Sequence, residues 1–294
     1  MGSITTRSFY SAAVLFSVLL LYVQTSLGND AGDQEARQAE IHLDQAIAEK
    51  DWAEVSKLLD GNFEWTDEHG QTQTRKQVLV DLLHFATNNS ASSDIQTHFY
   101  GDLDLLFGFR GSIRFSHIWV KRAAGWKAFI FIDTPRPATS TSAPTAPVQG
   151  GCENPCRTVP YTPTTTTDKT VLAEWQKTKI DEWQPNVADW EAHSADEVLI
   201  ITNKGERNKS ERLAIAKKNQ QEHIGVPGDP VLRMKMSDFD NTVVMISDHS
   251  PNRGGKPYHN VRLFVNRAGH WMIAWSQQTT MDAGTDATPV AGKQ

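Results

Sequence analysis

Two similar stretches of sequence decide the fold: VKRAAGWKAFIFIDT at 120–134 and VNRAGHWMIAWSQQTT at 265–280. Each opens with basic residues, passes through a Gly and a Trp, and continues into a run with alternating apolar side chains. Alternation with a period of two residues is typical of a strand with one buried face, and Gly favours a tight turn between strands. Both stretches therefore predict the same strand–turn–strand hairpin.

Three helices and one extended segment are predicted before the first hairpin. Apolar residues at helical spacing indicate helices over 36–50, 51–60 and 74–86, and the extended segment 63–70 ends at a Gly turn. Strands separated by turns that contain Gly then follow over 94–134. Helices followed by a run of strands predict an α+β domain.

The same order of elements is predicted before the second hairpin. Helices are expected over 171–183, 186–194 and 209–220, with an extended segment at 197–205 and strands over 231–280. Chance could produce one matching hairpin, but a matching order of all the elements favours an internal duplication.

The segment between the two copies is rich in Pro, Ser, Thr and Gly and has almost no large aliphatic side chains. Such a composition predicts a linker, because it has too little apolar surface to form a core. The predicted organisation is a signal peptide over 1–28, a first domain over 29–134, a linker over 135–167, a second domain over 168–281 and a disordered tail over 282–294.

Four stretches resemble the nuclear transport factor 2-like superfamily, and more narrowly its SnoaL-like branch, which is kin to ketosteroid isomerase. They are FEWTDEHGQTQTRKQVL (63–79), IWVKRAAGWKAFIF (118–131), EVLIITNKGERNKSERL (197–213) and LFVNRAGHWMIAW (263–275). The resemblance implies two tandem cone-shaped domains, each with about three helices packed on a curved antiparallel sheet. It also implies a pocket between helices and sheet, but it specifies function poorly, because this fold hosts enzymes and non-catalytic binders alike.

The N-terminus has the features of an export signal. Arg7 precedes an apolar run over 9–23, and the small residues Ser26 and Gly28 follow where a signal peptidase would cleave. A retained membrane anchor is the alternative, but the run is short for a bilayer. We therefore expect a periplasmic or extracellular protein with no membrane association once the signal is removed.

Only two Cys residues are present, Cys152 and Cys156 in GCENPC. In an oxidising compartment this spacing favours a short structural disulfide, with an intermolecular bridge as the alternative. The net charge of -6 is spread without a basic block, which argues against nucleic-acid binding. The sequence contains no zinc-binding or redox spacing of Cys and His, so it implies no metal and no cofactor.

Catalytic candidates follow from the resemblance to ketosteroid isomerase, in which a pocket carboxylate moves a proton. In the first domain we consider His117 with Asp67 or Asp133. His117 and Trp119 alternate along one predicted strand, so they share one face of the sheet. A solvated turn around Asp67 and a hydrogen-bonded structural role for His117 are the alternatives, and they are the commoner situation for such residues.

Large aromatic residues at amphipathic positions are the candidates for an apolar pocket, although core packing is their usual role. The candidate pocket residues are Trp52, Trp65, Trp119, Phe131, Trp183, His259 and Trp275.

Three functions are compatible with these patterns. The first is an exported protein that binds a small hydrophobic molecule or another protein, and the second is an isomerase, cyclase or dehydratase. The third is a structural role in which the two copies pair within one chain as a pseudo-dimer, or in which the protein forms a homodimer.

Overall fold

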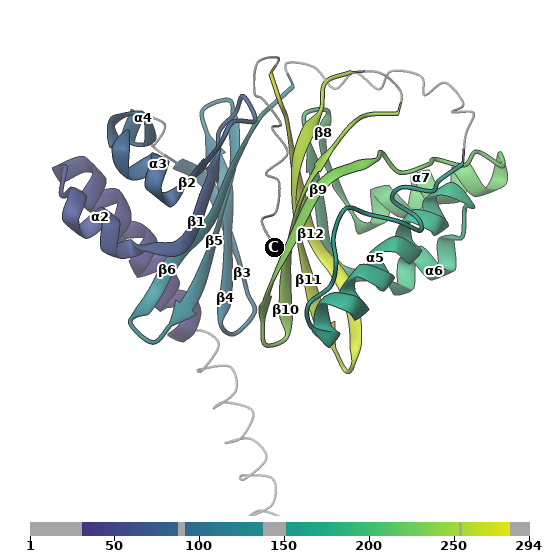
Figure 1. Cartoon of the computed structure of the whole chain (residues 1–294), viewed down its shortest axis with the longest axis horizontal. Helices are drawn as coiled ribbons and strands as arrows, with labels where there is room; N and C mark the ends of the chain where they lie inside the picture. Colours follow the sequence, from purple (N-terminus) through teal and green to yellow (C-terminus); the bar gives the residue numbers. More distant parts are fainter. Residues whose placement is uncertain (1–30, 88–91, 138–150, 253–254, 283–294) are drawn as a thin grey trace, which may run out of the picture.

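The computed structural model describes residues 31–87, 92–137, 151–252 and 255–282 (Figure 1). Two six-stranded sheets follow one another along the chain and face each other at the centre of the molecule, with their helices on the outer sides (Figure 1). We call residues 31–137 the first unit and residues 151–282 the second unit. The α+β class and the tandem arrangement predicted from the sequence are confirmed.

The first unit opens with a helix over 31–49, which buries Ala36, Leu43 and Ala46 on one face. The elements that follow are α2 (Trp52–Leu58), β1 (Leu59–Thr66), β2 (Thr72–Thr74), α3 (Arg75–Val80), α4 (Leu82–Thr87), β3 (Ser92–Phe99), β4 (Leu103–Arg110), β5 (Ile113–Arg122) and β6 (Gly125–Pro135).

The second unit repeats this order, and its first helix buries Val171, Thr178 and Asp181 at the same spacing as Ala36, Leu43 and Ala46. Its elements are α5 (Thr166–Trp183), α6 (Val187–Ala192), β7 (Ser194–Thr202), β8 (Gly205–Asn208), α7 (Lys209–Gln221), β9 (Val231–Phe239), β10 (Thr242–His249), β11 (Tyr258–Arg267) and β12 (His270–Thr280).

The two sheets have the same strand order, β2-β1-β6-β5-β4-β3 and β8-β7-β12-β11-β10-β9. Most neighbours are antiparallel, but β1 pairs with β6, and β7 with β12, in parallel. Each sheet is therefore mixed, whereas the sequence predicted an antiparallel one. The alternation along a strand shows which face is buried, but it does not show which distant strand lies alongside.

The repeated stretches form the β5–β6 and β11–β12 hairpins. Both turns have two residues between the strands, but their backbones differ. In the second unit the left-handed conformation falls on Ala268 and Gly269 (φ 53° and 88°), and in the first unit it falls on Gly125 (φ 98°). Gly adopts such angles without steric cost, which explains why a Gly lies in the second turn and another directly follows the first.

The two sheets pack against each other with approximate twofold symmetry. Thr134 and Thr279 hold corresponding positions in the two hairpins, and their hydroxyl oxygens are 2.8 Å apart. The Thr134 hydroxyl donates to the backbone oxygen of Gln278 (3.1 Å), and the Thr279 hydroxyl donates to that of Asp133 (2.6 Å). Such reciprocal contacts between corresponding positions are the pattern of a twofold dimer interface.

Around this axis lies an apolar cluster that draws side chains from both sheets, among them Leu105, Ile118, Leu263 and Trp275. Gln277 enters the cluster and donates to the backbone oxygens of Arg114 and Ile132, at 3.1 Å each. Its side-chain oxygen accepts a 2.6 Å hydrogen bond from Ser116. A buried amide with its donors and acceptor engaged avoids the cost of an unsatisfied polar group.

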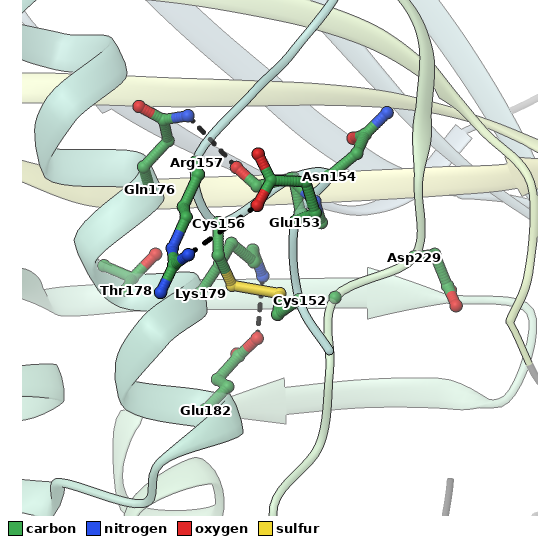
Figure 2. Close-up of a disulfide and its surroundings, with 12 residues drawn as sticks. Cys152, Glu153, Asn154, Cys156, Arg157, Gln176, Thr178, Lys179, Glu182 and Asp229 are labelled. Carbon is green, nitrogen blue, oxygen red and sulfur yellow. Dashed lines mark hydrogen bonds and ion pairs between the residues drawn. A yellow bond between two sulfur atoms is a disulfide. The ribbon is translucent and has the colours of Figure 1, made fainter. Parts of the chain in front are cut away.

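The second unit begins earlier than predicted. Cys152 and Cys156 are joined by a disulfide (S–S 2.07 Å) and are buried against α5 (Figure 2). Val159 and Tyr161 pack on the core of this unit, and the Tyr161 hydroxyl donates to Asp168 (2.7 Å). The sequence placed 135–167 in a linker because large side chains are scarce there, but these few residues are sufficient to fasten 151–165 to the second unit.

None of the helices in the described ranges is both long and apolar enough to span a membrane. The predicted signal peptide over 1–28 lies outside the described residues, as does residue 283 onward in the predicted tail.

Candidate functional site

A cavity of about 610 Å³ lies in the first unit, between the helix over 31–49, α4 and the strands β3 to β5. Its wall combines six polar or charged residues with seven apolar ones, and the apolar ones include Ile41, Ile47, Ile95, Leu106 and Phe115. Leu106 and Phe115 are buried, whereas Ile41 and Ile95 are about half exposed and mark the mouth. Predominantly apolar walls with a few fixed polar groups are typical of small-molecule sites.

The polar part of the cavity wall centres on His117. Its Nδ1 lies 2.7 Å from Oε1 of Glu40, and its Nε2 lies 2.8 Å from an Nη atom of Arg110. The second oxygen of Glu40 accepts a 2.7 Å hydrogen bond from Nε1 of Trp119. The Phe131 ring stacks on the imidazole with 3.5 Å between centroids. His117 is therefore held in one orientation by three neighbours, Glu40, Arg110 and Phe131.

The chain of polar contacts continues behind the cavity through Arg110. Its guanidinium forms a 3.2 Å ion pair with Asp133, and the other Asp133 oxygen accepts from Nε1 of Trp65 at 2.9 Å. The side chains of Arg110 and Asp133 are 6% and 2% exposed. Breaking such a buried pair from one side is costly, so the chain is expected to be rigid.

These contacts determine the tautomer of His117. A guanidinium can only donate, so Nε2 accepts from Arg110 and carries no proton. Nδ1 then carries the proton and donates a hydrogen bond to Glu40. Burial disfavours the charge of Glu40, but its contacts with His117, Trp119 and Arg110 more than offset this and lower its pKa. Both nitrogens of His117 are engaged, which is a poor arrangement for a general base.

Asp44 is the carboxyl group best placed to meet a ligand. It lines the cavity one helical turn after Glu40, with part of its surface exposed at the mouth. Burial, and secondly the negative charge of Glu40, raise its pKa to about 6. It has no hydrogen-bond or ion-pair partner among the described residues. A carboxyl group that titrates close to neutral pH is available both to accept a hydrogen bond and to exchange a proton.

The three residues predicted as catalytic are not all in one place. His117 lines the cavity and Asp133 lies behind it, joined to His117 through Arg110. Asp67 is buried elsewhere, where its Oδ1 accepts from the backbone N–H groups of His69 (3.0 Å) and Gln71 (2.8 Å). Burial raises the pKa of Asp67. Its geometry is that of a structural turn residue.

None of the predicted pocket aromatics lines this cavity. Trp65, Trp119 and Phe131 belong to the core of the first unit, and Trp52 packs on its edge. These positions reflect the usual preference of large rings for cores.

In the second unit, Trp275 is buried between the two sheets and Trp183 is half-buried at the end of α5. His259 is buried with Nδ1 2.7 Å from Asp248. None of these three residues lines the cavity of the first unit. Their pocket role stays a prediction.

Sequence reasoning missed Glu40, Asp44, Arg110 and the apolar residues of the mouth. A signal was present, because Glu40 and Asp44 are four residues apart and so share one face of the first helix. That face also carries the buried stripe, and acidic residues beside a buried stripe are uncommon without a polar partner or a cavity.

The corresponding region of the second unit has different residues. The strand register places Arg262 where the first unit has His117, and His249 where it has Arg110. Trp175 of α5 faces Arg262, with its ring centroid 5.3 Å from the guanidinium carbon, as Glu40 faces His117. The repeat therefore preserves the positions that line the site but not the chemistry.

The mouth of the second unit is closed by the segment 151–157. Asn154 forms two hydrogen bonds with the backbone of Val231 (2.9 and 3.0 Å), whose register position matches Ser92 at the open mouth. Gln176, one residue after Trp175, donates to the backbone oxygen of Pro155 (3.1 Å; Figure 2). In the first unit Ile41 follows Glu40 and lines the cavity. The disulfide-bonded segment thus joins the two lips that remain apart in the first unit.

Among the residues that the structure describes, no three His, Cys, Asp or Glu side chains are grouped so that they could hold a metal ion.

Comparisons with known proteins give structural neighbours only. No family model and no curated protein matches the sequence. An NTF2-like protein from Cytophaga hutchinsonii is 14% identical, and the match covers 40% of this chain and 100% of that chain with a TM-score of 0.35. A proposed dehydratase of the NTF2-like family from Streptomyces avermitilis is 15% identical, with 37% and 99% covered and a TM-score of 0.32.

An NTF2-like protein of unknown function from Pseudomonas putida is 14% identical, with 39% and 94% covered and a TM-score of 0.31. Each match covers a share of this chain close to the length of one unit. Each unit has its helices on one face of a six-stranded sheet, which agrees with the α+β layout predicted from the sequence.

Proposed function

We propose that the first unit binds a small, mainly apolar molecule that carries one hydrogen-bond donor. The observation that carries this proposal is the cavity of about 610 Å³, with apolar side chains over about half of its wall and Asp44 at one side. Its volume is within the range of roughly 300–1,000 Å³ that small-molecule sites occupy.

The requirement for a donor follows from which polar atoms are already engaged. Both oxygens of Glu40 and both nitrogens of His117 have partners. Arg37 at the rim pairs with Asp33 and contacts Thr97. Asp44 is the carboxylate that is left to accept a hydrogen bond, so a hydroxyl or an amine on the ligand would complement it.

An enzyme is the second candidate, and the raised pKa of Asp44 is the observation that favours it. In an isomerase, cyclase or dehydratase, Asp44 would transfer the proton, and the engaged His117 would only shape the site. Binding without chemistry is the better-supported function, since no second unengaged acid or base lines the cavity within the described residues.

We further propose that the second unit serves the first as an internal partner, since its sheet covers the one surface that a single cone-shaped domain would leave exposed. Export to the periplasm or the extracellular space is part of this proposal and is based on residues 1–28.

Isothermal titration calorimetry with two matched probes tests the binding proposal. 2-Naphthol carries a hydroxyl donor, whereas 2-methoxynaphthalene has the same rings without one. We expect the purified protein to bind 2-naphthol about tenfold more tightly, since a hydrogen bond to a charged group contributes about 1.5 kcal/mol.

Two Trp substitutions on the same helix provide the control. Ala48 lines the cavity and is exposed, so Ala48→Trp is expected to block the mouth and abolish binding of both probes. Gln45 is exposed and does not line the cavity, so Gln45→Trp should bind normally. Absence of binding by the unmodified protein, or equal loss in the two variants, would contradict the proposal.

A further inference from the structure

Arg262 on β11 of the second unit is a buried cation without an acidic partner. The residue is 5% exposed, and no carboxylate of the described residues lies within ion-pair distance of its guanidinium. Its hydrogen bond is from Nη1 to the hydroxyl of Ser247, at 2.8 Å. Burial lowers the pKa of Arg262 to about 10, so the group is still charged at neutral pH. A buried charge is costly unless it is paired.

His249, which shares the Ser247 hydroxyl with Arg262, does not supply the missing negative charge. Its Nδ1 lies 3.1 Å from the backbone oxygen of Asp229, and its Nε2 lies 2.8 Å from the Ser247 hydroxyl. Burial, and secondly the charge of Arg262, lower the pKa of His249 well below its usual value, so the ring is neutral. The hydroxyl of Ser247 can therefore donate to His249 while it accepts from Arg262.

Trp175 provides an unsatisfied donor next to Arg262. The residue is fully buried, and its Nε1–H has no acceptor among the described residues. The Arg262 guanidinium carbon is 5.3 Å from the centroid of the same ring. The guanidinium of Arg262 and the indole N–H of Trp175 therefore both lack an anionic acceptor. A buried N–H without an acceptor is rare in folded proteins.

Other charged groups nearby add to the positive character of this region. Lys179 and Arg212 share one carboxylate, that of Glu182, at 2.8 and 2.7 Å. Asp229, the other acid close by, accepts from the Tyr258 hydroxyl (3.1 Å) and from the backbone N–H of Asn252 (2.8 Å). Figure 2 shows Lys179 and Glu182 beside the disulfide that closes the mouth.

The first unit shows what is missing. There His117, at the position of Arg262, contacts the carboxylate of Glu40 at 2.7 Å. In the second unit the helix presents Trp175 at that place. The second unit therefore has an indole N–H where the first has a carboxylate, and the side chain that faces it is a permanent cation.

We propose that the second unit binds a small carboxylate or phosphate anion, held by Arg262 and by the Nε1–H of Trp175. The anion supplies the negative charge that the carboxylate of Glu40 supplies to the corresponding set of residues in the first unit. It is a different ligand at a different site from the one proposed for the first unit. The segment 151–157 lies across the mouth, so the site suits a small anion better than a large ligand.

Calorimetric titration with sodium acetate and with sodium phosphate tests this proposal, in HEPES buffer with sodium chloride at equal ionic strength as the reference. We expect saturable binding of one anion per chain for acetate, phosphate or both. Binding of acetate alone identifies a carboxylate site, and binding of phosphate alone identifies a phosphate site. No heat above the chloride reference for either anion would overturn the proposal.

Variants locate the site. Arg262→Met is expected to abolish binding, and Trp175→Phe to weaken it about tenfold, because a hydrogen bond to a charged group is lost. Trp275→Phe is the matched control, since Trp275 is also fully buried with an unpartnered Nε1–H but lies between the sheets. Equal affinities in the Trp175→Phe and Trp275→Phe proteins would overturn the proposal even if the Arg262 variant did not fold.

Discussion

The two units have the same fold but opposite chemistry at the positions that face their first helix. The first unit has Arg110 and His117 where the second has His249 and Arg262, and only the first supplies a carboxylate, Glu40, to this set. The charged chain of the first unit is complete within the protein, whereas the second unit has an excess cation. A few side chains on a preserved strand register are therefore sufficient to give the two copies different chemistry at these positions.

The mouths of the units differ as well. The first is open between Ile41 and Ser92. In the second, Asn154 bonds to the backbone of Val231 and the Pro155 backbone oxygen accepts from Gln176, so the corresponding lips are joined. The positions of the hairpin turns and the reciprocal contacts of Thr134 and Thr279 at the twofold axis are common to both units. The fold is thus maintained by the turns and the interface, and the site can change without affecting either.

The largest expected effect comes from removing the arginine of each unit in turn. Arg110→Met leaves Asp133 buried without its cation, so we expect the free energy of unfolding to fall by about 3 kcal/mol. Arg262→Met removes an unpaired cation, so in HEPES buffer without acetate or phosphate it should cause little loss or a gain. Urea unfolding followed by Trp fluorescence measures both. Equal losses would show that the two arginines are equally well paired.

The second prediction converts one position of the first unit to its counterpart in the second. Asp104 is fully buried, and neither of its carboxylate oxygens has a hydrogen-bond partner among the described residues. The strand register matches it with Val243. Burial raises the pKa of Asp104 to about 8, so the folded protein keeps a proton that the unfolded chain releases near pH 4. The free energy of unfolding should therefore fall as the pH rises from about 4 to about 8.

Asp104→Val is expected to remove this fall and to stabilise the protein by about 2 kcal/mol at pH 8. Thermal and urea unfolding at pH 4, 6 and 8 would measure it. Asp102→Val, at an exposed position in the adjacent turn, is the control and should leave the pH dependence unchanged. A parallel pH dependence in the Asp104 variant would mean that Asp104 is not responsible.

A third prediction concerns the asymmetry of the interface. Gln277 and Ser116 form a hydrogen bond, while the corresponding positions, Ile132 and Val261, are apolar. Gln277→Ile should lower the free energy of unfolding by about 1.5 kcal/mol, because the Ser116 hydroxyl loses its buried partner. The double variant with Ser116→Val should recover part of this loss. A double-mutant cycle with no coupling would argue against a specific polar contact.

The smallest effect is expected in the pH dependence of ligand binding. Because the pKa of Asp44 is raised to about 6, its carboxylate forms as the pH rises through that value and then accepts the hydroxyl of 2-naphthol. The affinity for 2-naphthol should increase severalfold, by less than about tenfold, between pH 5 and pH 7. Asp44→Asn should remove this increase, and Glu49→Gln, at an exposed position outside the cavity, should retain it. An unchanged profile in Asp44→Asn would exclude Asp44 as the acceptor.

The sequence predicted the parts of the fold that depend on local patterns. The hairpins at 120–134 and 265–280 follow from alternation and Gly, and the tandem order follows from their repetition. The parallel pairing of β1 with β6 was missed, since a residue pattern does not name the neighbouring strand. The site was missed for a similar reason. Glu40, Arg110 and Asp133 are far apart in the chain, and only tertiary packing makes one of them the partner of the next.

The contact between Thr134 and Thr279 has a consequence for how this protein can change. In a homodimer every substitution occurs twice, once on each side of the axis, so a residue favourable on one side must also be tolerated on the other. Here the two sides are separate stretches of one chain, and their effective concentration is set by the covalent connection rather than by the amount of protein. Association then needs no free partner. Each half can acquire its own binding site while the other half keeps it folded.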